Sequence, residues 1–224
     1  DTIPPELTIT YPEDLDYLST SNVTVEWIGT DQGSGVVRYE WRLDAGTWQF
    51  AAGNTEWSFP DLSEGMHSVD IRATDLSNKV TERRVVFYID HTLPTLSMTA
   101  PSEGAVFDEG NVTINWEGSD VWSGLDHFEI WLNGQFQFTS DGTSANLSNL
   151  RDGVYNVTLK AIDKAGNAVS DHVTFIVDTI SPTIEITSPT HLAYTNSTPL
   201  ISWTYDELNL DHFEIKIDGG TFAP

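Results

Sequence analysis

The stretch Asp90–Pro94 (DHTLP) decides how this sequence is organised, because related stretches occur twice more. Asp1–Pro5 reads DTIPP and Asp178–Pro182 reads DTISP, so in each copy an Asp stands four residues before a Pro. The copies begin about 88 residues apart, which is the length of a small β domain. We therefore predict two complete modules and part of a third. Their bounds are 1–89 for module one, 90–177 for module two and 178–224 for the N-terminal part of module three.

Apolar residues alternate with polar ones in each module, as in half-buried β-strands. Trp27, Trp116 and Trp203 each stand in such an alternation. No stretch long enough for a helix has a helical period. Turn signals that supply positive φ angles follow the next alternating segment of each module. They are Asp44–Gly46, Asn133–Gly134 and Asp218–Gly219. We predict an all-β chain of tandem antiparallel immunoglobulin-like β-sandwiches with about seven strands each, the third being incomplete.

A tyrosine corner supports the same fold. Leu150–Tyr155 (LRDGVY) has the Leu-x-x-Gly-x-Tyr form, and we expect the Tyr155 hydroxyl to bond the backbone a few residues upstream. Module one carries His67 at the equivalent position. We expect its ring to donate a hydrogen bond to the matching carbonyl, which is a structural role.

The formal net charge of −24 excludes some partners and favours others. Nucleic acid is excluded because its phosphates would be repelled, whereas saline surroundings and divalent cations are favoured. Acidic residues occur in all three modules, so they belong to folded surfaces. The absence of cysteine excludes disulfides and thiolate chemistry. No apolar run reaches the length of a membrane span and no signal-peptide pattern stands at Asp1, so we expect a soluble segment without membrane insertion.

Several motifs resemble the immunoglobulin-like repeats of bacterial and archaeal cell-surface proteins. They are Trp116–Leu125 (WEGSDVWSGL), Ala161–Asn167 (AIDKAGN) and Asp178–Pro182. The similarity covers the whole chain, although module three lacks the Ser-Gly pair of the first motif. The resemblance implies an extracellular protein, secreted or anchored to the cell surface, such as an adhesin, a stalk, a surface-layer protein or a filament subunit.

Acidic residues recur at three places that a sandwich of this kind brings to one pole. These are the start of the first strand, the loop between the second and third strands (B–C) and the last hairpin loop (F–G). In module two they hold Asp90, Asp120, Asp163 and Asn167, and in module one Asp1, Asp31, Asp75 and Asn78. Three converging carboxylates repel one another unless a cation lies among them. Carboxylate and amide oxygens suit Ca²⁺, so we predict Ca²⁺ at the module joints.

Two further points bear on these acids. Glu64 and Asp61, in the turn before the sixth strand (E–F), are expected to face module two and to add ligands across the joint. The alternative interpretation needs no metal, because Asp side chains often bond their own backbone in turns. In module three, Asp178 and Asp206 are the matching acids, and we expect this joint to be the looser one.

Five asparagines begin an Asn-x-Ser/Thr sequon, which is the acceptor for N-glycosylation. They are Asn22, Asn111, Asn146, Asn156 and Asn196. Asn22 and Asn111 stand at the same place in their modules, just before the second strand. Surface glycans would fit a cell-surface protein. The alternative is that Thr is common in strands and Asn in turns, so that sequons arise by chance.

No sequence motif indicates catalysis, and we expect no enzyme activity and no organic cofactor. Four tryptophans are not all explained by core alternation and are candidates for stacking on sugars: Trp48, Trp57, Trp122 and Trp131. Trp131 is the candidate binding surface, because it points outward from its strand. The alternative role for Trp131 is to cover the edge of the sheet.

Together these features predict an extracellular repeat segment that spaces, stiffens or assembles a prokaryotic surface protein. The neighbouring repeats are its expected partners. Two alternatives stay open. One is a filament subunit, completed when another copy of the chain adds strands to module three. The other is a spacer or carbohydrate-binding accessory region of a secreted enzyme, with surface glycans as the ligand.

Overall fold

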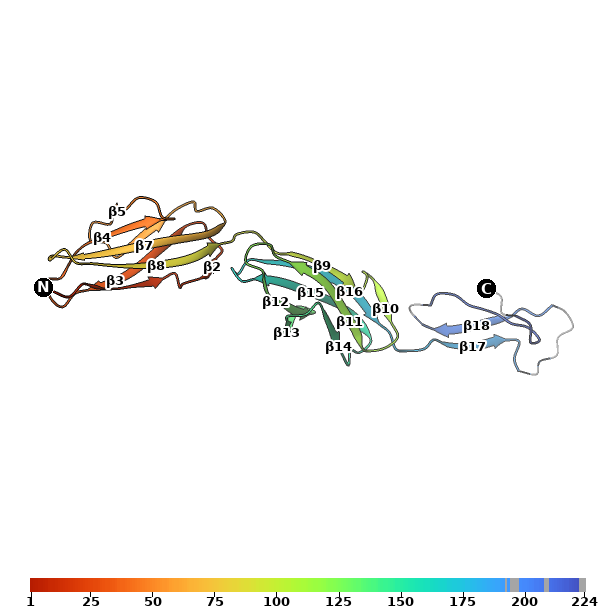
Figure 1. The fold of residues 1–224 in the computed structure, drawn as a ribbon. Coiled ribbons are helices and arrows are strands. Elements are labelled where there is room, and N and C mark those ends of the chain that lie inside the picture. Colours follow the sequence, from red (N-terminus) through yellow and green to blue (C-terminus); the bar gives the residue numbers. More distant parts are fainter. Residues whose placement is uncertain (192, 194–197, 208–209, 222–224) are drawn as a thin grey trace.

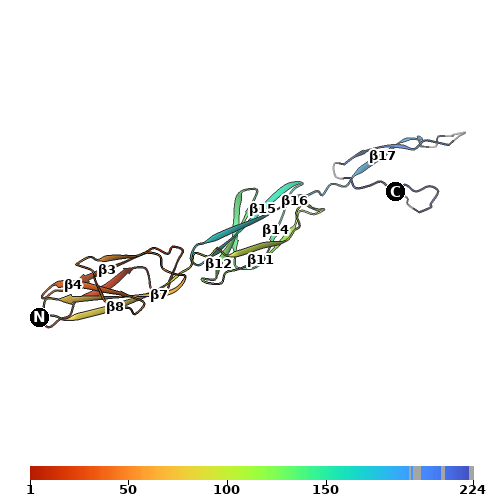
Figure 2. The ribbon, with the colours of Figure 1, turned by 90° about the horizontal axis from the view of Figure 1, so that it is seen from above.

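The computed structural model describes residues 1–191, 193, 198–207 and 210–221, and these contain β-strands and turns but no helix. Three units follow one another end to end, with the N-terminus at the far tip of the first (Figure 1). A view turned by 90° shows the same extended row (Figure 2). No helix in the described residues is available to cross a membrane.

Module one is a sandwich of two sheets. The smaller sheet has the order β1 (Glu6–Tyr11), β3 (Val23–Thr30) and β6 (Glu56–Phe59). The larger sheet has the order β2 (Asp16–Leu18), β8 (Val80–Ile89), β7 (Gly65–Asp75), β4 (Val36–Leu43) and β5 (Gln49–Phe50). All pairs are antiparallel except β2 with β8.

Module two repeats this arrangement. Its smaller sheet has the order β14 (Ser144–Leu147), β11 (Val112–Ser119) and β9 (Thr95–Ala100). Its larger sheet has the order β10 (Ala105–Phe107), β16 (Ala168–Val177), β15 (Gly153–Asp163), β12 (Leu125–Leu132) and β13 (Gln135–Ser140). The tandem immunoglobulin-like sandwich predicted from the sequence is confirmed.

Each complete module has eight strands where about seven were predicted, because the first strand is split in two. β1 pairs with β3 in the small sheet, and after Pro12 the chain crosses to the large sheet, where β2 pairs with β8. In module two the chain crosses from the small sheet to the large sheet after Pro101. Proline has no N–H to donate and so suits the point at which a strand leaves its ladder.

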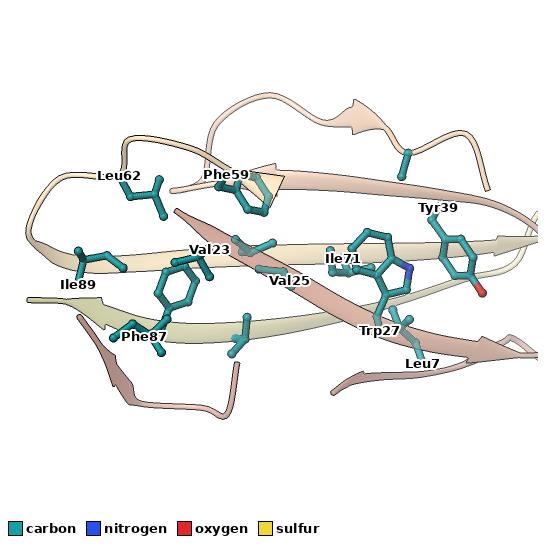
Figure 3. Close-up of a cluster of buried hydrophobic side chains, with 14 of the residues drawn as sticks. Leu7, Val23, Val25, Trp27, Tyr39, Phe59, Leu62, Ile71, Phe87 and Ile89 are labelled. Atoms are coloured by element: carbon teal, nitrogen blue, oxygen red, sulfur yellow. The ribbon is translucent and has the colours of Figure 1, made fainter. Parts of the chain in front are cut away.

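A tryptophan fills the centre of each complete module. Trp27 is 1% exposed and packs edge-on against Tyr39 at 5.9 Å between ring centroids (Figure 3). Trp116, also 1% exposed, meets Phe128 in the same way at 5.6 Å. Val, Ile and Leu from both sheets surround these rings. The inward residues are those that the alternation predicted.

The predicted turns and corner are also present. Asp44, Asn133 and Asp218 have φ angles of 46°, 49° and 49°, as tight hairpin turns require. The Tyr155 hydroxyl donates to the carbonyl of Arg151 at 2.8 Å. His67 replaces this contact in module one, with Nε2 lying 2.8 Å from the carbonyl of Ser63.

Module three is described as a two-stranded sheet, β17 (Thr183–Ser188) with β18 (Ser202–Asp206). One face of this pair is apolar and exposed: Ile184 is 61%, Ile186 64% and Trp203 38% exposed. The register pairs Ile186 with Trp203, as Ile9 pairs with Trp27 in module one. These residues therefore match positions that are buried or half-buried in the complete modules.

Candidate metal centres at the module poles

Three carboxylates meet at the pole of module two that faces module one. Asp90 comes from the linker before β9, Asp120 from the loop between β11 and β12, and Asp163 from the end of β15. One carboxylate oxygen of each lies within 4.8 Å of the others. Asp90 and Asp163 are each 1% exposed. The strand order brings these three segments together, although 30 residues separate Asp90 from Asp120 and 43 separate Asp120 from Asp163 in the sequence.

Backbone N–H groups fix the Asp90 carboxylate. Its Oδ1 accepts from Thr92 N at 3.0 Å and its Oδ2 from Ser123 N at 2.9 Å. Ser123 lies in the loop that also carries Asp120 and is only 4% exposed. Asp90 thereby ties the linker between the two modules to the body of module two.

The Asp163 carboxylate is held by Asn167, from the same hairpin loop. Its Oδ1 accepts from Asn167 N at 2.8 Å and its Oδ2 from Asn167 Nδ2 at 2.9 Å. Nδ2 also donates to the Asp90 carbonyl at 2.8 Å. Asn167 was predicted to be an oxygen ligand. In this structure its amide nitrogen faces the acids, so it acts as a hydrogen-bond donor.

Asp120 has one oxygen without a hydrogen-bond partner. Its Oδ1 accepts from Trp122 N at 3.0 Å and Gly124 N at 2.8 Å, as in a capped loop. Its Oδ2 is buried and has no donor among the described residues. A buried carboxylate oxygen without a donor is costly to desolvate. A cation between Asp90, Asp120 and Asp163 would satisfy it, so the residues present fit a hard divalent metal.

Module one has a matching cluster of Asp1, Asp31 and Asp75, whose nearest oxygens again lie within 4.8 Å. Asp75 is fully buried. Burial raises the pKa of Asp75, but hydrogen bonds from Lys79 N and Ser77 Oγ outweigh it and leave the pKa below its ordinary value. Oδ2 of Asp31 is buried and, like that of Asp120, has no hydrogen-bond donor in the part of the chain that the structure describes.

Lys79 distinguishes the two clusters. The carbonyl of Lys79 accepts from Asp75 N as that of Asn167 accepts from Asp163 N. Lys79 Nζ donates to the Asp1 carbonyl at 2.5 Å, which is the contact that Asn167 Nδ2 makes with Asp90. Lys79, and not Asn78 as predicted, therefore takes the place of Asn167. Lys79 was not among the predicted site residues, although it stands four residues after Asp75, as Asn167 does after Asp163.

Glu64 and Asp61 were predicted to add metal ligands across the joint, and the structure gives them other roles. Glu64 Oε1 accepts from His91 N at 3.3 Å and Thr92 Oγ1 at 2.6 Å, and His91 Nδ1 lies 3.1 Å away. Glu64 therefore holds the first residues of the linker. Asp61 is outside both carboxylate clusters of the described residues. Its backbone N donates to Asn22 Oδ1 at 3.1 Å.

The joint after module two has a related contact. The Asp152 carboxylate accepts from Thr179 N at 2.9 Å and Thr179 Oγ1 at 2.8 Å, as Glu64 does for the first linker. The register pairs Asp206 with Thr183, so Asp206 is a strand residue and Glu207 follows as the counterpart of Asp120. The prediction that assigned Asp206 to this place was wrong by one residue.

The four tryptophans outside the core alternation have separate surroundings. Trp48 lies over the guanidinium groups of Arg42 and Arg72, at 4.6 and 3.9 Å. Trp57 packs on Trp41 at 5.2 Å between ring centroids. Trp122 is 52% exposed and reaches toward module one. A Cβ atom placed on Gly65 would be 3.9 Å from its ring.

Trp131 lies on the outer face of β12 and is half-buried. Its ring meets Phe136 of the neighbouring edge strand β13 edge-on, at 5.5 Å. Its Nε1 donates to Glu129 at 3.1 Å. These contacts favour the edge-covering role over the sugar-binding one.

A comparison with family models identifies the central part of the chain. Residues 94–159 match the model of the bacterial Ig domain. This match covers most of module two, which resembles a bacterial immunoglobulin-like domain. The search of curated proteins gives no match. The bacterial Ig domain match begins four residues after Asp90, so two of the three acids of module two, Asp90 and Asp163, lie just outside the matched range.

Solved structures show a similar fold. The fibronectin(III)-like modules of Clostridium thermocellum CbhA match with a TM-score of 0.58 and 15% identity, covering 77% of this chain and 94% of that one. Three N-terminal domains of the bacteriophage RB49 outer capsid protein Hoc give a TM-score of 0.37 and 13% identity, with coverage of 92% and 69%. Bacteroides ovatus SGBP-B, solved with a mixed-linkage heptasaccharide, gives a TM-score of 0.32 and 14% identity. The match covers 99% of this chain and 66% of that one. The likeness to the CbhA modules, at 15% identity, concerns the fold alone.

Proposed function

We propose that this chain is a spacer segment of an extracellular prokaryotic protein, in which Ca²⁺ stiffens the joints between immunoglobulin-like modules. The observation that supports this most strongly is the cluster of Asp90, Asp120 and Asp163. One of its three members belongs to the linker itself, so a metal held there joins the linker to the two loops of module two. The role is mechanical and does not involve catalysis.

The electrostatics favour a cation at this cluster. Asp90 and Asp163 are almost fully buried, and backbone and amide donors satisfy five of the six carboxylate oxygens in the cluster. The buried Oδ2 of Asp120 has no donor among the described residues. Carboxylate oxygens are the ligands that Ca²⁺ prefers, with water and backbone carbonyls completing its shell.

Lys79 makes the two clusters unequal. Its ammonium group stands next to the module one acids, where module two has the uncharged amide of Asn167. A fixed positive charge nearby reduces the gain from adding a divalent cation. We therefore expect the module two cluster to bind Ca²⁺ more tightly than the module one cluster.

Calcium titration with thermal unfolding tests this proposal. Extracellular modules bind Ca²⁺ with Kd values of about 10⁻⁴–10⁻³ M, so ~10 mM Ca²⁺ should stabilise module two by about 1.5–3 kcal/mol. The Asp120→Asn variant keeps the oxygen that caps the loop and loses the charge, so its melting temperature should not respond. Equal melting curves in calcium and in chelator would remove the proposal.

Charge screening has to be separated from specific binding, because a chain with a net charge of −24 is stabilised by any added cation. Mg²⁺ at the same concentration is the matched control. It demands near-octahedral geometry and gives up its water reluctantly. An equal response to both ions, or an equal response of the Asp120→Asn variant, would indicate screening.

Self-assembly through module three is a second candidate function, favoured by its exposed apolar face. Ile184, Ile186 and Trp203 present a surface that strands of another copy can cover. Sedimentation equilibrium of the Ile186→Asp variant tests it, with Thr187→Asp on the opposite face as the control. If the unaltered chain stays monomeric at all concentrations, this candidate fails.

A further inference from the structure

We propose that Asn22 and Asn111 are N-glycosylation sites whose glycans stand beside the module joints. Both asparagines begin a sequon, Asn22-Val-Thr and Asn111-Val-Thr. Each directly precedes the second strand of its module, β3 or β11, and each is exposed. The two sites are thus structurally equivalent, one module length apart.

Each side chain uses its oxygen in the fold and leaves its nitrogen available. Asn22 Oδ1 accepts from Asp61 N at 3.1 Å, and Asn111 Oδ1 accepts from Asn149 N at 3.4 Å. Neither Nδ2 donates a hydrogen bond to another described residue. Glycosylation attaches at Nδ2 and preserves the side-chain carbonyl, so the contact with the turn survives the modification.

The reaction requires a sugar donor and a transferase supplied by the cell. An oligosaccharide bound through its C1 to a polyisoprenoid phosphate or pyrophosphate is the donor class. The bond between C1 and the phosphate oxygen breaks, and a bond between C1 and Nδ2 forms. One Nδ2 proton is lost, and the lipid phosphate leaves with the electron pair. No oxidant or reductant is needed.

Asn156 is an internal contrast, because its sequon lies in a different environment. It is half-buried on β15, a strand paired on both sides with β12 and β16. Its Nδ2 donates to Thr174 Oγ1 at 3.4 Å and its Oδ1 accepts from Thr158 Oγ1 at 3.2 Å. A glycan here would have to stand on the sheet face, so we expect Asn156 to remain unmodified.

The other two sequons begin at Asn146 and Asn196. Asn146 is exposed on the edge strand β14, and its Oδ1 accepts from Thr113 Oγ1 at 2.7 Å, which again leaves Nδ2 without a bond to the described residues. We expect it to be modified too. Asn196 lies outside the described residues.

The position of Asn22 connects its glycan to the joint. The turn that it holds runs from Asp61 to Gly65 and is fixed also by Leu62 N, which donates to the Ser21 carbonyl at 2.9 Å. Glu64 in the same turn holds the first residues of the linker. A glycan on Asn22 therefore stands next to the linker, where it restricts bending and shields the backbone from proteases.

Site-specific mass spectrometry tests the proposal. The whole chain is secreted from a host that has an oligosaccharyltransferase for Asn-x-Ser/Thr. The peptides are treated with a peptide N-glycosidase in ¹⁸O water, so that each occupied Asn becomes labelled Asp. We expect label at Asn22 and Asn111 and none at Asn156. The proposal would be overturned if Asn22 and Asn111 were unlabelled, or if Asn156 were labelled to the same extent as Asn22 and Asn111.

Variants of the sequon hydroxyl provide the controls. Thr24→Ala removes the sequon but keeps Asn22 and its contact with Asp61, whereas Thr24→Ser keeps both. The glycopeptide should be lost in the first variant and retained in the second. Limited proteolysis then measures the effect on the joint. The glycosylated Thr24→Ser chain should be cut in the linker more slowly than Thr24→Ala, and equal rates would show that the glycan does not shield the joint.

Discussion

Asp70 lies on the outer face of β7 and is 5% exposed, between two arginines of neighbouring strands. Arg84 contacts it through Nε at 2.7 Å and Nη2 at 3.0 Å, and Arg42 through Nε at 2.8 Å. Hydrogen bonds from Arg84 hold the pKa of Asp70 below its ordinary value, against the opposing effect of burial, and Arg42 adds to the lowering. The same Arg42 supports Trp48.

The Asp70→Asn variant should therefore lose stability in a pH-dependent way. At pH 7 we expect a loss of about 1–3 kcal/mol in the free energy of unfolding of module one, since a charged hydrogen-bond partner is removed. A lowered folded-state pKa stabilises the fold above the unfolded pKa of about 3.9 and ceases to do so as the pH falls through the folded value. Urea unfolding at several pH values should show the two proteins converging below about pH 4. A difference independent of pH would contradict this assignment.

Tyr155 gives a second prediction at the level of one atom. Its hydroxyl donates to the Arg151 carbonyl and accepts from Arg151 N at 3.0 Å, which closes the turn before β15. Tyr155→Phe removes only this oxygen. We expect module two to lose about 1–2 kcal/mol of stability for the two hydrogen bonds together, measured by chemical denaturation. An unchanged midpoint would show that water replaces both contacts.

At the scale of the strand, a glycine in the second strand of each complete module makes room for the core aromatic ring. A Cβ atom on Gly118 would lie 2.9 Å from Phe128 Cε1 and 3.1 Å from the Thr95 carbonyl. Gly29 has the same relation to Tyr39. In module three the register gives this place to Tyr205, whose ring meets Phe213 at 5.0 Å. Module three therefore keeps the strand register of the complete modules, but a tyrosine ring occupies the place of the glycine.

Gly118→Ala should destabilise module two by about 1–3 kcal/mol through overpacking. Gly142→Ala is the matched control, because the nearest atom to its added Cβ is Ser140 Oγ at 3.7 Å, an ordinary contact. Differential scanning calorimetry should show a lower melting temperature for the first variant alone. Equal behaviour of the two variants would mean that Phe128 moves aside at little cost.

At the scale of the whole molecule, the joints decide how far the row of modules can bend (Figure 1). Each complete module has its own hydrophobic core, so it is expected to contact only its neighbours and to unfold nearly independently. Glu64 contributes hydrogen bonds to the linker from module one, and Asp90 ties that linker to module two. These few contacts, rather than a large interface, restrict the joint.

Removal of Glu64 should loosen the first joint without unfolding either module. The absence of native cysteine allows spin labels on Glu56→Cys and Asp141→Cys, one in each module, without background labelling. Double electron–electron resonance should give a broader distribution of distances between the two spin labels in the Glu64→Ala background. Asp61→Asn is the control. Asparagine tolerates the positive φ of 54° at that position, and the substitution leaves the linker contacts in place. An unchanged width would exclude Glu64 as the joint contact.

The repeat of modules, their strands and most of the turns could be predicted from the sequence. Alternation around Trp27 and Trp116, hairpin glycines and the Tyr155 corner are local signals, and each follows from the geometry of a strand or a turn over a few residues. The matching acids of the two modules could likewise be found by aligning repeats.

The contacts that these acids make depend on the tertiary structure. Whether Asp90, Asp120 and Asp163 meet depends on strand order over the whole module, and which oxygen lacks a donor depends on side-chain positions within a few ångströms. The exchange of Asn167 for Lys79, and the use of Glu64 as a linker contact, depend in the same way on atoms that are distant in the sequence. Such interactions weaken or vanish over a few ångströms, and no periodic pattern in the chain records them.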